Sequence, residues 1–459
     1  MQEVRIEKDS IGKRELPKNA YYGVQSLRAH ENFPISGQKV HKQFIRAIAE
    51  IKKAAAMTNM QAGVISERIA SVMITACDEI IAGKFNSDFI VGAIQGGAGT
   101  SLNMNANEII ANRALELLGE NKGDYTLIHP NDHANCAQST NDVFPSAGKI
   151  ATIRLLQCAT VQLQALRQAF IEKSEQYRTV LKMGRTEMQD AVPVSFGQVF
   201  NAYASAISRD ITRFAHAIDA LSVLNMGGTA IGTGISATSY YIDNIIPNLC
   251  TVTSLPLVQA DDLIDATQNL DVFVFVSGIV KSCAVTLSKI ANDLRLMSSG
   301  PRTGFAEINL PAKQNGSSIM PGKINPVIPE VVSQVAFLII GNDATITHAA
   351  EAGQLELNAF EPIIFCRLFE SLETLTNVAR VFKCECVEGI TVNAERSKKE
   401  IEDSITTITA FCPLIGYTKA AALAKKALRE EKTIRQILIE EKILSSEEID
   451  KILSPDTMV

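Results

Sequence analysis

The chain carries the stretch GSSIMPGKINP at residues 316–326, between two long helical patterns. Its glycines permit backbone angles closed to other residues, while its prolines fix φ and bar a continuous helix. The stretch is therefore a loop that can move and then be held. Several hydrogen-bond donors and one positive charge in it suit a carboxylate ligand, and they belong to Ser317, Ser318, Lys323 and Asn325. A plain interhelical turn has the same composition, so the loop alone leaves both interpretations open.

Long helical patterns with few breakers surround this loop. They cover residues 145–178, 194–224, 262–298, 327–348 and 355–386, and several exceed the average helix length of about 11 to 12 residues. Within the third pattern, Val272–Val276 has the β-branched and aromatic residues of a strand. Helical spacing continues beyond it at Ile279, Cys283 and Leu287, so the longer pattern predicts a helix. The sequence predicts a mainly α fold with an elongated bundle of five helices.

The segments on either side of the bundle are shorter. Residues 1–37 are polar and punctuated by glycine and proline, which predicts an arm. Helical spacing predicts further helices at 40–60, 66–82 and 102–118. After Asn393 the helical patterns shorten, with a turn at Pro413 and Gly416. We predict three domains: an N-terminal helical domain over residues 1–141, the central bundle over 142–393 and a small C-terminal helical domain over 394–459.

Composition and charge exclude several classes of protein. A hydrophobic share of 46% and a charged share of 20% are those of an ordinary soluble globular chain. A net charge of −6 argues against nucleic acid as the main partner. The start, Met1–Lys8, lacks the apolar core of a signal peptide, and the most apolar short run, Val272–Val280, is far shorter than a bilayer span. Nine cysteines, an odd number scattered along the chain, indicate reduced thiols. The prediction is a soluble cytoplasmic protein with no membrane partner.

Neither a metal nor a nucleotide cofactor is predicted. The only close cysteine pair, Cys384 and Cys386, lacks the further ligands of a zinc site, and none of the six histidines stands at metal-ligand spacing. The glycine-rich stretch 96–101 lacks the lysine of a phosphate loop, and 232–234 is not the full dinucleotide fingerprint. We therefore expect the protein to work without a cofactor.

Three further polar clusters interrupt the helical sequence, at Gly97–Asn105, Asn131–Asp142 and Gly184–Asp190. Each has an ordinary structural explanation, since a helix cap would account for Ser139–Asp142 and a turn for the glycines before Thr100. The helix predicted at 102–118 also carries a group of asparagines, which are poor helix formers: Asn103, Asn105, Asn107 and Asn112. Such a group predicts hydrogen bonds to loops or to a ligand.

Together these blocks resemble the aspartase/fumarase superfamily. Residues 316–326 are similar to its signature loop, and its other blocks are matched by residues 96–101, Gln138–Asp142 and Gly184–Thr186. The resemblance runs from Arg5 to about Tyr417, nearly the whole chain. Within the superfamily, four stretches look like the aspartate ammonia-lyases rather than the class II fumarases: Tyr21–Val24, Ser139-Thr140, Pro326–Val331 and Glu351–Gln354.

The resemblance implies a three-domain fold whose central bundles join in a homotetramer, with each active site shared by three subunits. It implies reversible deamination of L-aspartate to fumarate and ammonia through an aci-carboxylate intermediate. Ser317 would be the base, as an alkoxide on a mobile loop, and Asn141 would face the amino group. The reacting carboxylate would be held by Thr100, Ser139, Thr140 and Ser318, with Ser101 also at the substrate, and the other carboxylate by Thr186, Lys323 and Asn325.

Glu187 departs from the superfamily pattern, in which His, or Gln in some aspartases, commonly follows the threonine. A carboxylate there favours a substrate ammonium by charge but repels substrate carboxylates at close range. If Glu330 lies near it, the two would share a proton. We hypothesise that Glu187 binds the amino group and disfavours malate; an outward-pointing side chain is the alternative.

Two other functions compete with aspartate deamination. Class II fumarate hydratases belong to the same superfamily, and so do non-catalytic lens crystallins that retain the fold. Retention of Ser317, Lys323 and Asn325 argues against the crystallin interpretation. An assay with L-aspartate and with L-malate separates all three functions.

Overall fold

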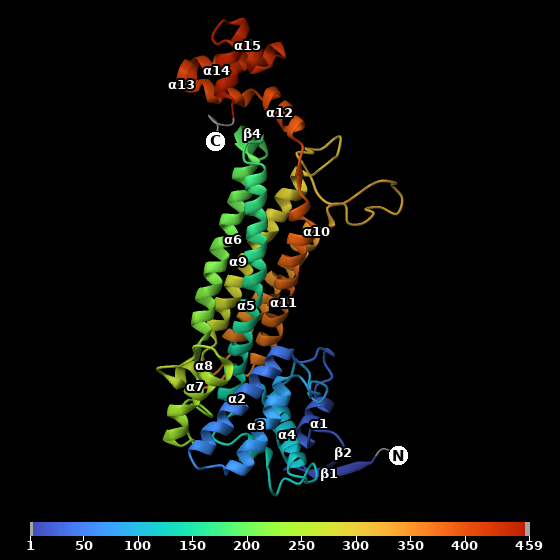
Figure 1. Cartoon of the computed structure of the whole chain (residues 1–459), viewed down its shortest axis with the longest axis vertical. Coiled ribbons are helices and arrows are strands. Elements are labelled where there is room, and N and C mark those ends of the chain that lie inside the picture. The colour runs from blue at the N-terminus through green and yellow to red at the C-terminus, as the bar shows by residue number, and fades with distance from the viewer. Residues whose placement is uncertain (1–2, 455–459) are drawn as a thin grey trace. The chain divides into compact units, whose positions relative to one another are not determined.

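The computed structural model describes residues 3–454 and is mainly helical (Figure 1). The outermost residues of the two predicted terminal domains, Met1–Gln2 and 455–459, lie outside the described part. The described chain divides into two compact units. The first unit comprises Met1–Ala159, Arg213–Lys281 and Leu338–Thr374, and the second comprises Thr160–Thr212, Ser282–Phe337 and Leu375–Val459. The division into three domains stays a prediction.

Five long helices dominate the described chain, as the sequence predicted, and each has residues in both units. They are α5 (Thr140–Gln176), α6 (Phe196–Leu221), α9 (Asp271–Met297), α10 (Val327–Glu351) and α11 (Glu361–Glu385) (Figure 1). The strand-like run Val272–Val276 lies inside α9, which confirms the helical interpretation. The longer apolar periodicity therefore outweighed local β-propensity.

The ends of three long helices differ from the prediction, and one of these is α11, which begins at Glu361, six residues after the predicted start at 355. Helix α5 begins at Thr140, five residues before the predicted start, although Pro145 lies in its second turn. Proline has no N–H for the carbonyl of Asn141, and the side-chain amide of Asn225 donates to that carbonyl instead, at 3.0 Å. The predicted helix at 262–298 is broken at Asn269, whose backbone is extended, into α8 (Leu263–Gln268) and α9.

The first unit holds the shorter N-terminal helices α2 (Lys42–Gln61), α3 (Glu67–Ile81) and α4 (Thr100–Leu117), all close to their predicted ranges. It also holds α7 (Ser239–Thr253), which the sequence analysis did not predict, the π-helical turn η1 (Pro130–Ala134) and the parallel pair β5 (Val223–Leu224) and β6 (Val258–Gln259). Its core contains a cluster of buried aromatic rings whose centroids lie about 5 to 6 Å apart. The cluster consists of Phe44, Phe144, Phe273, Phe365 and Phe369.

The N-terminal arm is more regular than predicted. It forms an antiparallel hairpin of β1 (Val4–Lys8) and β2 (Lys13–Pro17), followed by helix α1 (Val24–Asn32). Helix α1 begins here because the N–H groups at its start donate to the carboxylates of Glu7 and Glu108, of which Glu108 is distant in sequence. Glu108 belongs to α4, so local composition carried no sign of this helix start.

The second unit contains an antiparallel hairpin of β3 (Leu181–Thr186) and β4 (Gln189–Ser195), and the short pair β7 (Ile308–Asn309) and β8 (Thr391–Val392). Beyond Asn393 its helices are short, as predicted: α12 (Ala394–Asp403), α13 (Cys412–Ile415), α14 (Tyr417–Glu430), α15 (Ile434–Glu440) and α16 (Ser446–Ile452), with the 3-10 segment η3 (Ile405–Phe411). A second 3-10 segment, η2 (Val387–Gly389), precedes Asn393. Several of these segments share a small core around Phe411, Leu423 and Ile437.

Candidate active site

Thr100 and Ser101 begin helix α4 in the first unit. The three residues before them have positive φ, with Gly99 at +86°, and this left-handed turn directs the chain into the helix. Thr100 is exposed, Ser101 is half-buried, and both line a cleft of about 680 Å³. The N–H groups of Thr100 and Leu102 are already bonded, to the Gly97 carbonyl and the Gln95 side chain, so the partial positive charge of the helix start is what favours an anion here.

Ser139, Thr140 and Asn141 form the start of helix α5 in the same unit. The amide nitrogen of Asn141 donates to the carbonyl oxygen of Ala230 at 2.7 Å, which leaves its amide oxygen as the atom to accept from an ammonium group. The hydroxyl oxygen of Thr140 accepts a hydrogen bond from the side-chain amide of Asn103 at 3.0 Å. This hydrogen bond therefore joins helix α4 to helix α5 at Thr140, one of the predicted site residues.

Asp142 holds this segment in place. Its fully buried carboxylate accepts backbone N–H bonds from Ser139 at 2.9 Å and from Gly227 and Thr229 at 3.2 and 3.1 Å. Burial raises the pKa of Asp142 to about 6, while those N–H bonds oppose the rise. Asp142 thus ties the start of α5 to a loop some 85 residues away in sequence.

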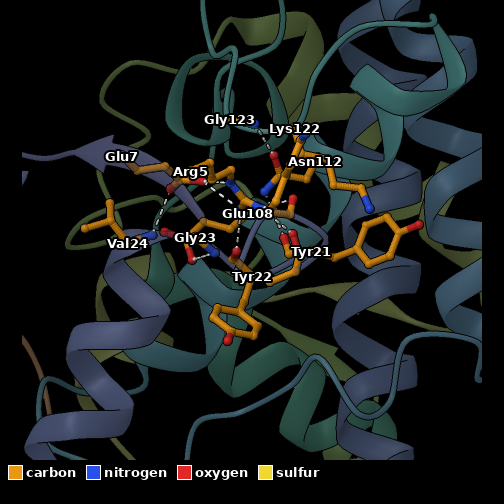
Figure 2. Close-up of polar contacts among 12 residues, drawn as sticks. Arg5, Glu7, Tyr21, Tyr22, Gly23, Val24, Glu108, Asn112, Lys122 and Gly123 are labelled. Atoms are coloured by element: carbon orange, nitrogen blue, oxygen red, sulfur yellow. Dashed lines mark hydrogen bonds and ion pairs between the residues drawn. The ribbon is translucent and has the colours of Figure 1, made fainter. Parts of the chain in front are cut away.

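Glu108, which also lines the cleft of Thr100 and Ser101, belongs to a buried carboxylate cluster with Glu7. Glu108 accepts from the N–H of Gly23 at 2.8 Å, and Glu7 accepts from the N–H of Val24 at 2.9 Å and from Arg5 at 2.8 Å (Figure 2). Burial raises the pKa of Glu108 to about 7, and the neighbouring Glu7 charge adds to the rise. The cluster caps helix α1, which forms part of the cleft wall.

The loop at 316–326 lies in the second unit, directly before helix α10. Its ends are pinned together, because Gly316 N–H donates to the Lys323 carbonyl at 2.7 Å and the Asn325 amide donates to the Gly316 carbonyl at 2.9 Å. The hydroxyl oxygen of Ser317 accepts two backbone N–H bonds, from Ile319 at 3.2 Å and Met320 at 2.9 Å. The loop therefore directs two donors at one serine oxygen.

The tip of this loop is open to solvent. Ser318 and Lys323 are exposed, and Ile319 exposes 84% of its surface. Asn325 and Ser317, at the pinned base, are half-buried. Met320 and Ile324, on the same loop, are exposed as well.

Thr186 and Glu187 belong to the hairpin of β3 and β4 in the second unit. Glu187 and Met188 are the two residues of its tight turn, and both have positive φ, of 51° and 67°. Such turns normally carry Asn and Gly, so this turn is strained. Glu187 is exposed, and it lines a cleft of about 570 Å³ together with Arg185 and Glu307.

Arg185 anchors the hairpin. Its guanidinium pairs with the fully buried carboxylate of Glu307 and with Glu400 of α12 at 3.1 Å, and Lys182 pairs with Glu307 at 3.3 Å. Two cations thus lie beside one buried carboxylate, and removal of either would leave that charge less well paired. The ion pairs fix the strand that carries Thr186. Glu330, which the sequence analysis considered as a neighbour of Glu187, has a carboxylate oxygen 4.0 Å from the guanidinium of Arg295.

Residues 3–454, the described part of the chain, contain no cluster of three or more His, Cys, Asp or Glu side chains arranged to hold a metal ion. The one close cysteine pair is split, with Cys386 buried and Cys384 exposed.

A family model described as Lyase matches residues 12–341, well over half of the chain, and one described as Fumarase C C-terminus matches residues 408–459. The chain belongs to the aspartase/fumarase superfamily of lyases. An aspartate ammonia-lyase of a Bacillus species is 51% identical over 99% of this chain and 97% of that protein. The aspartate ammonia-lyase of Helicobacter pylori strain 26695 is 50% identical over 99% and 98%.

Solved structures of this superfamily have the same fold. A fumarate lyase:delta crystallin from Brucella melitensis bound to cobalt has a TM-score of 0.96 and 46% identity, with 99% of each chain covered. A class II fumarase from Schistosoma mansoni has a TM-score of 0.95 and 34% identity, again with 99% of each chain covered. These likenesses confirm the predicted fold class.

The predicted site residues of this superfamily member fall into two groups. Thr100, Ser101 and residues 139–141 lie in the first unit, and Thr186, Glu187, Ser317, Ser318, Lys323 and Asn325 lie in the second. The sequence analysis missed Asp142 and Asn103 as supports of the first group. Both residues belong to polar clusters of the sequence, but apart from Ser139 their partners lie 32 or more residues away, so spacing carried no signal of the pairing.

Proposed function

We propose that this protein is an aspartate ammonia-lyase that converts L-aspartate reversibly to fumarate and ammonia. The observation that carries the proposal is the 45 to 51% identity, over 99% of the chain, to aspartate ammonia-lyases of eight bacterial strains and species. The superfamily also includes fumarases, but the class II fumarase structure is only 34% identical. Fumarate hydration is therefore the second candidate.

The difficult step of this reaction is removal of a proton from the carbon next to a carboxylate, because that proton has very low acidity. Its removal places two negative charges on that carboxylate, so the site must aim preorganised donors at its oxygens and exclude water. The donors we assign to the reacting carboxylate are Thr100, Ser139, Thr140 and Ser318, with Ser101 at the substrate beside them. Those assigned to the other carboxylate are Thr186, Lys323 and Asn325. The amide oxygen of Asn141 receives the amino group.

Ser317 is our candidate base. A serine alkoxide forms only where fixed donors stabilise it, and two backbone N–H groups of the loop already donate to its oxygen. The loop's pinned base and exposed tip suit a segment that closes over the substrate. Closure removes water and brings the positive charge of Lys323 toward the bound carboxylate.

The test of Ser317 is its replacement by alanine. Ser317→Ala should reduce turnover of L-aspartate by at least about a hundredfold, as loss of a general base commonly does, with the oligomer intact by size-exclusion chromatography. Ser36→Ala is the matched control, because Ser36 is exposed and its hydroxyl oxygen also accepts a backbone N–H, from Gln38 at 3.2 Å. Near-normal turnover of Ser317→Ala would remove Ser317 from the role.

The substrate itself is tested by following fumarate absorbance with L-aspartate and with L-malate. Aspartate ammonia-lyase activity requires fumarate formation from L-aspartate. Formation from L-malate alone would identify a fumarate hydratase, and formation from neither would favour a non-catalytic protein.

We further propose a homotetramer whose active sites draw residues from three subunits. Apolar side chains remain exposed on two long helices, including Phe275 and Val285 on α9 and Phe337, which is 65% exposed, on α10. By length and composition these two helices would also suffice to cross a membrane. We assign the exposed apolar side chains to contacts between subunits, since burial in a partner satisfies them equally well. A cytoplasmic location remains part of the proposal.

A further inference from the structure

The asparagines of helix α4 are a polar group from the sequence analysis that the proposed site leaves unused. In the structure, the four asparagines fall into two pairs that have different hydrogen-bond partners. Asn105 accepts from Ile90 N–H at 3.0 Å and donates to the Asp88 carbonyl at 3.1 Å, and Asn112 accepts from Gly123 N–H at 2.7 Å. These two bind loops. Asn103 and Asn107 instead donate to the side-chain oxygen of Asn135, each at 3.1 Å.

A buried lysine sets the direction of these hydrogen bonds. The Nζ of Lys52 donates to Asn135 Oδ1 at 2.8 Å; burial lowers the pKa of Lys52 to about 7, and its charged form has donors but no acceptor. Asn135 must therefore present its oxygen to Lys52, while its nitrogen donates to the Gln138 carbonyl at 3.1 Å, one residue before Ser139. Lys52 is only 1% exposed, so water is not available as a substitute partner.

The orientation of Asn135 in turn fixes the orientation of Asn103, which contacts the site residue Thr140. Because Asn135 Oδ1 is an acceptor, Asn103 must turn its nitrogen toward it, and the second hydrogen of that nitrogen goes to Thr140 Oγ1 at 3.0 Å. Asn103 is 1% exposed and Thr140 8%, so the arrangement is enclosed. The Thr140 oxygen is thereby used as an acceptor, and its own hydrogen remains to be donated elsewhere.

We propose that Asn103, oriented by Asn135 and Lys52, is a positioning residue that makes the Thr140 hydroxyl a hydrogen-bond donor to the substrate carboxylate. The inference rests on the proposed function, in which Thr140 binds the reacting carboxylate. A donor already aimed at that carboxylate needs no reorganisation as negative charge develops there. Loss of Asn103 should therefore lower kcat more than it raises KM.

The experiment is a double-mutant comparison in the full-length protein. Asn103→Ala should lower kcat/KM for L-aspartate about tenfold or more, since loss of a single preorganised donor costs up to about a hundred- to a thousandfold. In a Thr140→Val background, which has no hydroxyl to orient, the same change should cost less than about twofold. In a Thr140→Ser background, which keeps the hydroxyl, the loss should persist. Equal losses in all three backgrounds would overturn the inference, because a purely structural effect does not depend on the hydroxyl.

Asn105→Ala is the matched control, since it removes the same residue type and two hydrogen bonds from the same helix without touching Thr140. It should keep kcat near that of the parent protein at temperatures where both are folded. If Asn103→Ala does not fold, Asn103→Ser, which keeps a small polar group in the buried network, takes its place with the same expected pattern. A parent protein inactive on L-aspartate would refute the proposed function; an active parent with unchanged kcat in Asn103→Ala would refute only this inference.

Discussion

Replacing Gly99 by alanine should destabilise the protein and impair the site through one defined clash. Gly99 has a φ of +86°, which costs an alanine roughly 1 to 2 kcal/mol. An added Cβ would also lie 2.3 Å from the ring of Phe144, far inside any real contact. That ring is buried in the aromatic cluster, with Phe44 at 4.8 Å between centroids, so it has no free space to move into.

The magnitude follows from the two costs together. Overpacking a close-packed core costs about 1 to 3 kcal/mol, so Gly99→Ala should lose about 2 to 5 kcal/mol of unfolding free energy in all. Gly322→Ala is the matched control, because Gly322 has a similar φ of +79° but nothing within 4 Å of the added Cβ. It should lose only the backbone cost, roughly 1 to 2 kcal/mol.

Urea unfolding monitored by circular dichroism checks the difference, at one protein concentration because subunit association shifts apparent stability. Turnover of L-aspartate should also fall in Gly99→Ala, since the clash displaces Thr100, the next residue. Equal stability losses in the two variants would refute the packing argument, and a destabilised Gly99→Ala with full turnover would refute the link to the site.

Three further predictions test separate parts of the molecule. Lys323→Met should raise KM for L-aspartate at least about tenfold, because it removes a charge-assisted hydrogen bond to the substrate. The unfolding midpoint should change little, since Lys323 is exposed. An unchanged saturation curve would contradict the role of Lys323 in binding a substrate carboxylate. Glu187→His should lower activity on L-aspartate or create activity on L-malate, and if steady-state kinetics show neither, Glu187 does not discriminate the amino group. Burial raises the pKa of Glu108 from 4.5 to about 7, so between these pH values the folded protein binds more protons than the unfolded chain. The contribution of Glu108 to the free energy of unfolding therefore falls as pH rises from about 4.5 to about 7. Glu108→Gln should flatten the decline in unfolding midpoint from about pH 4.5 to about 7, and an unchanged slope would show that Glu108 does not titrate there.

Sequence alone determined the helical architecture of this protein. Apolar residues at three- and four-residue steps identify a helix locally, and the long patterns outweighed the strand-like Val272–Val276. It also identified the loop 316–326, because glycine and proline act on their own backbone, and the superfamily blocks around it. The asparagines of α4 were expected to bind loops or a ligand, and Asn105 and Asn112 bind loops.

Tertiary structure decided the features that depend on partners distant in sequence. Helix α1 begins where it does because Glu108, some 85 residues away, binds its N–H groups, and α5 extends back past Pro145 because Asn225 takes the freed carbonyl of Asn141. The direction in which Thr140 presents its hydroxyl depends on Lys52, Asn135 and Asn103, which come from three separate segments. A buried polar group must be paired, but composition does not say with what, since only the folded chain brings donor and acceptor within about 3 Å.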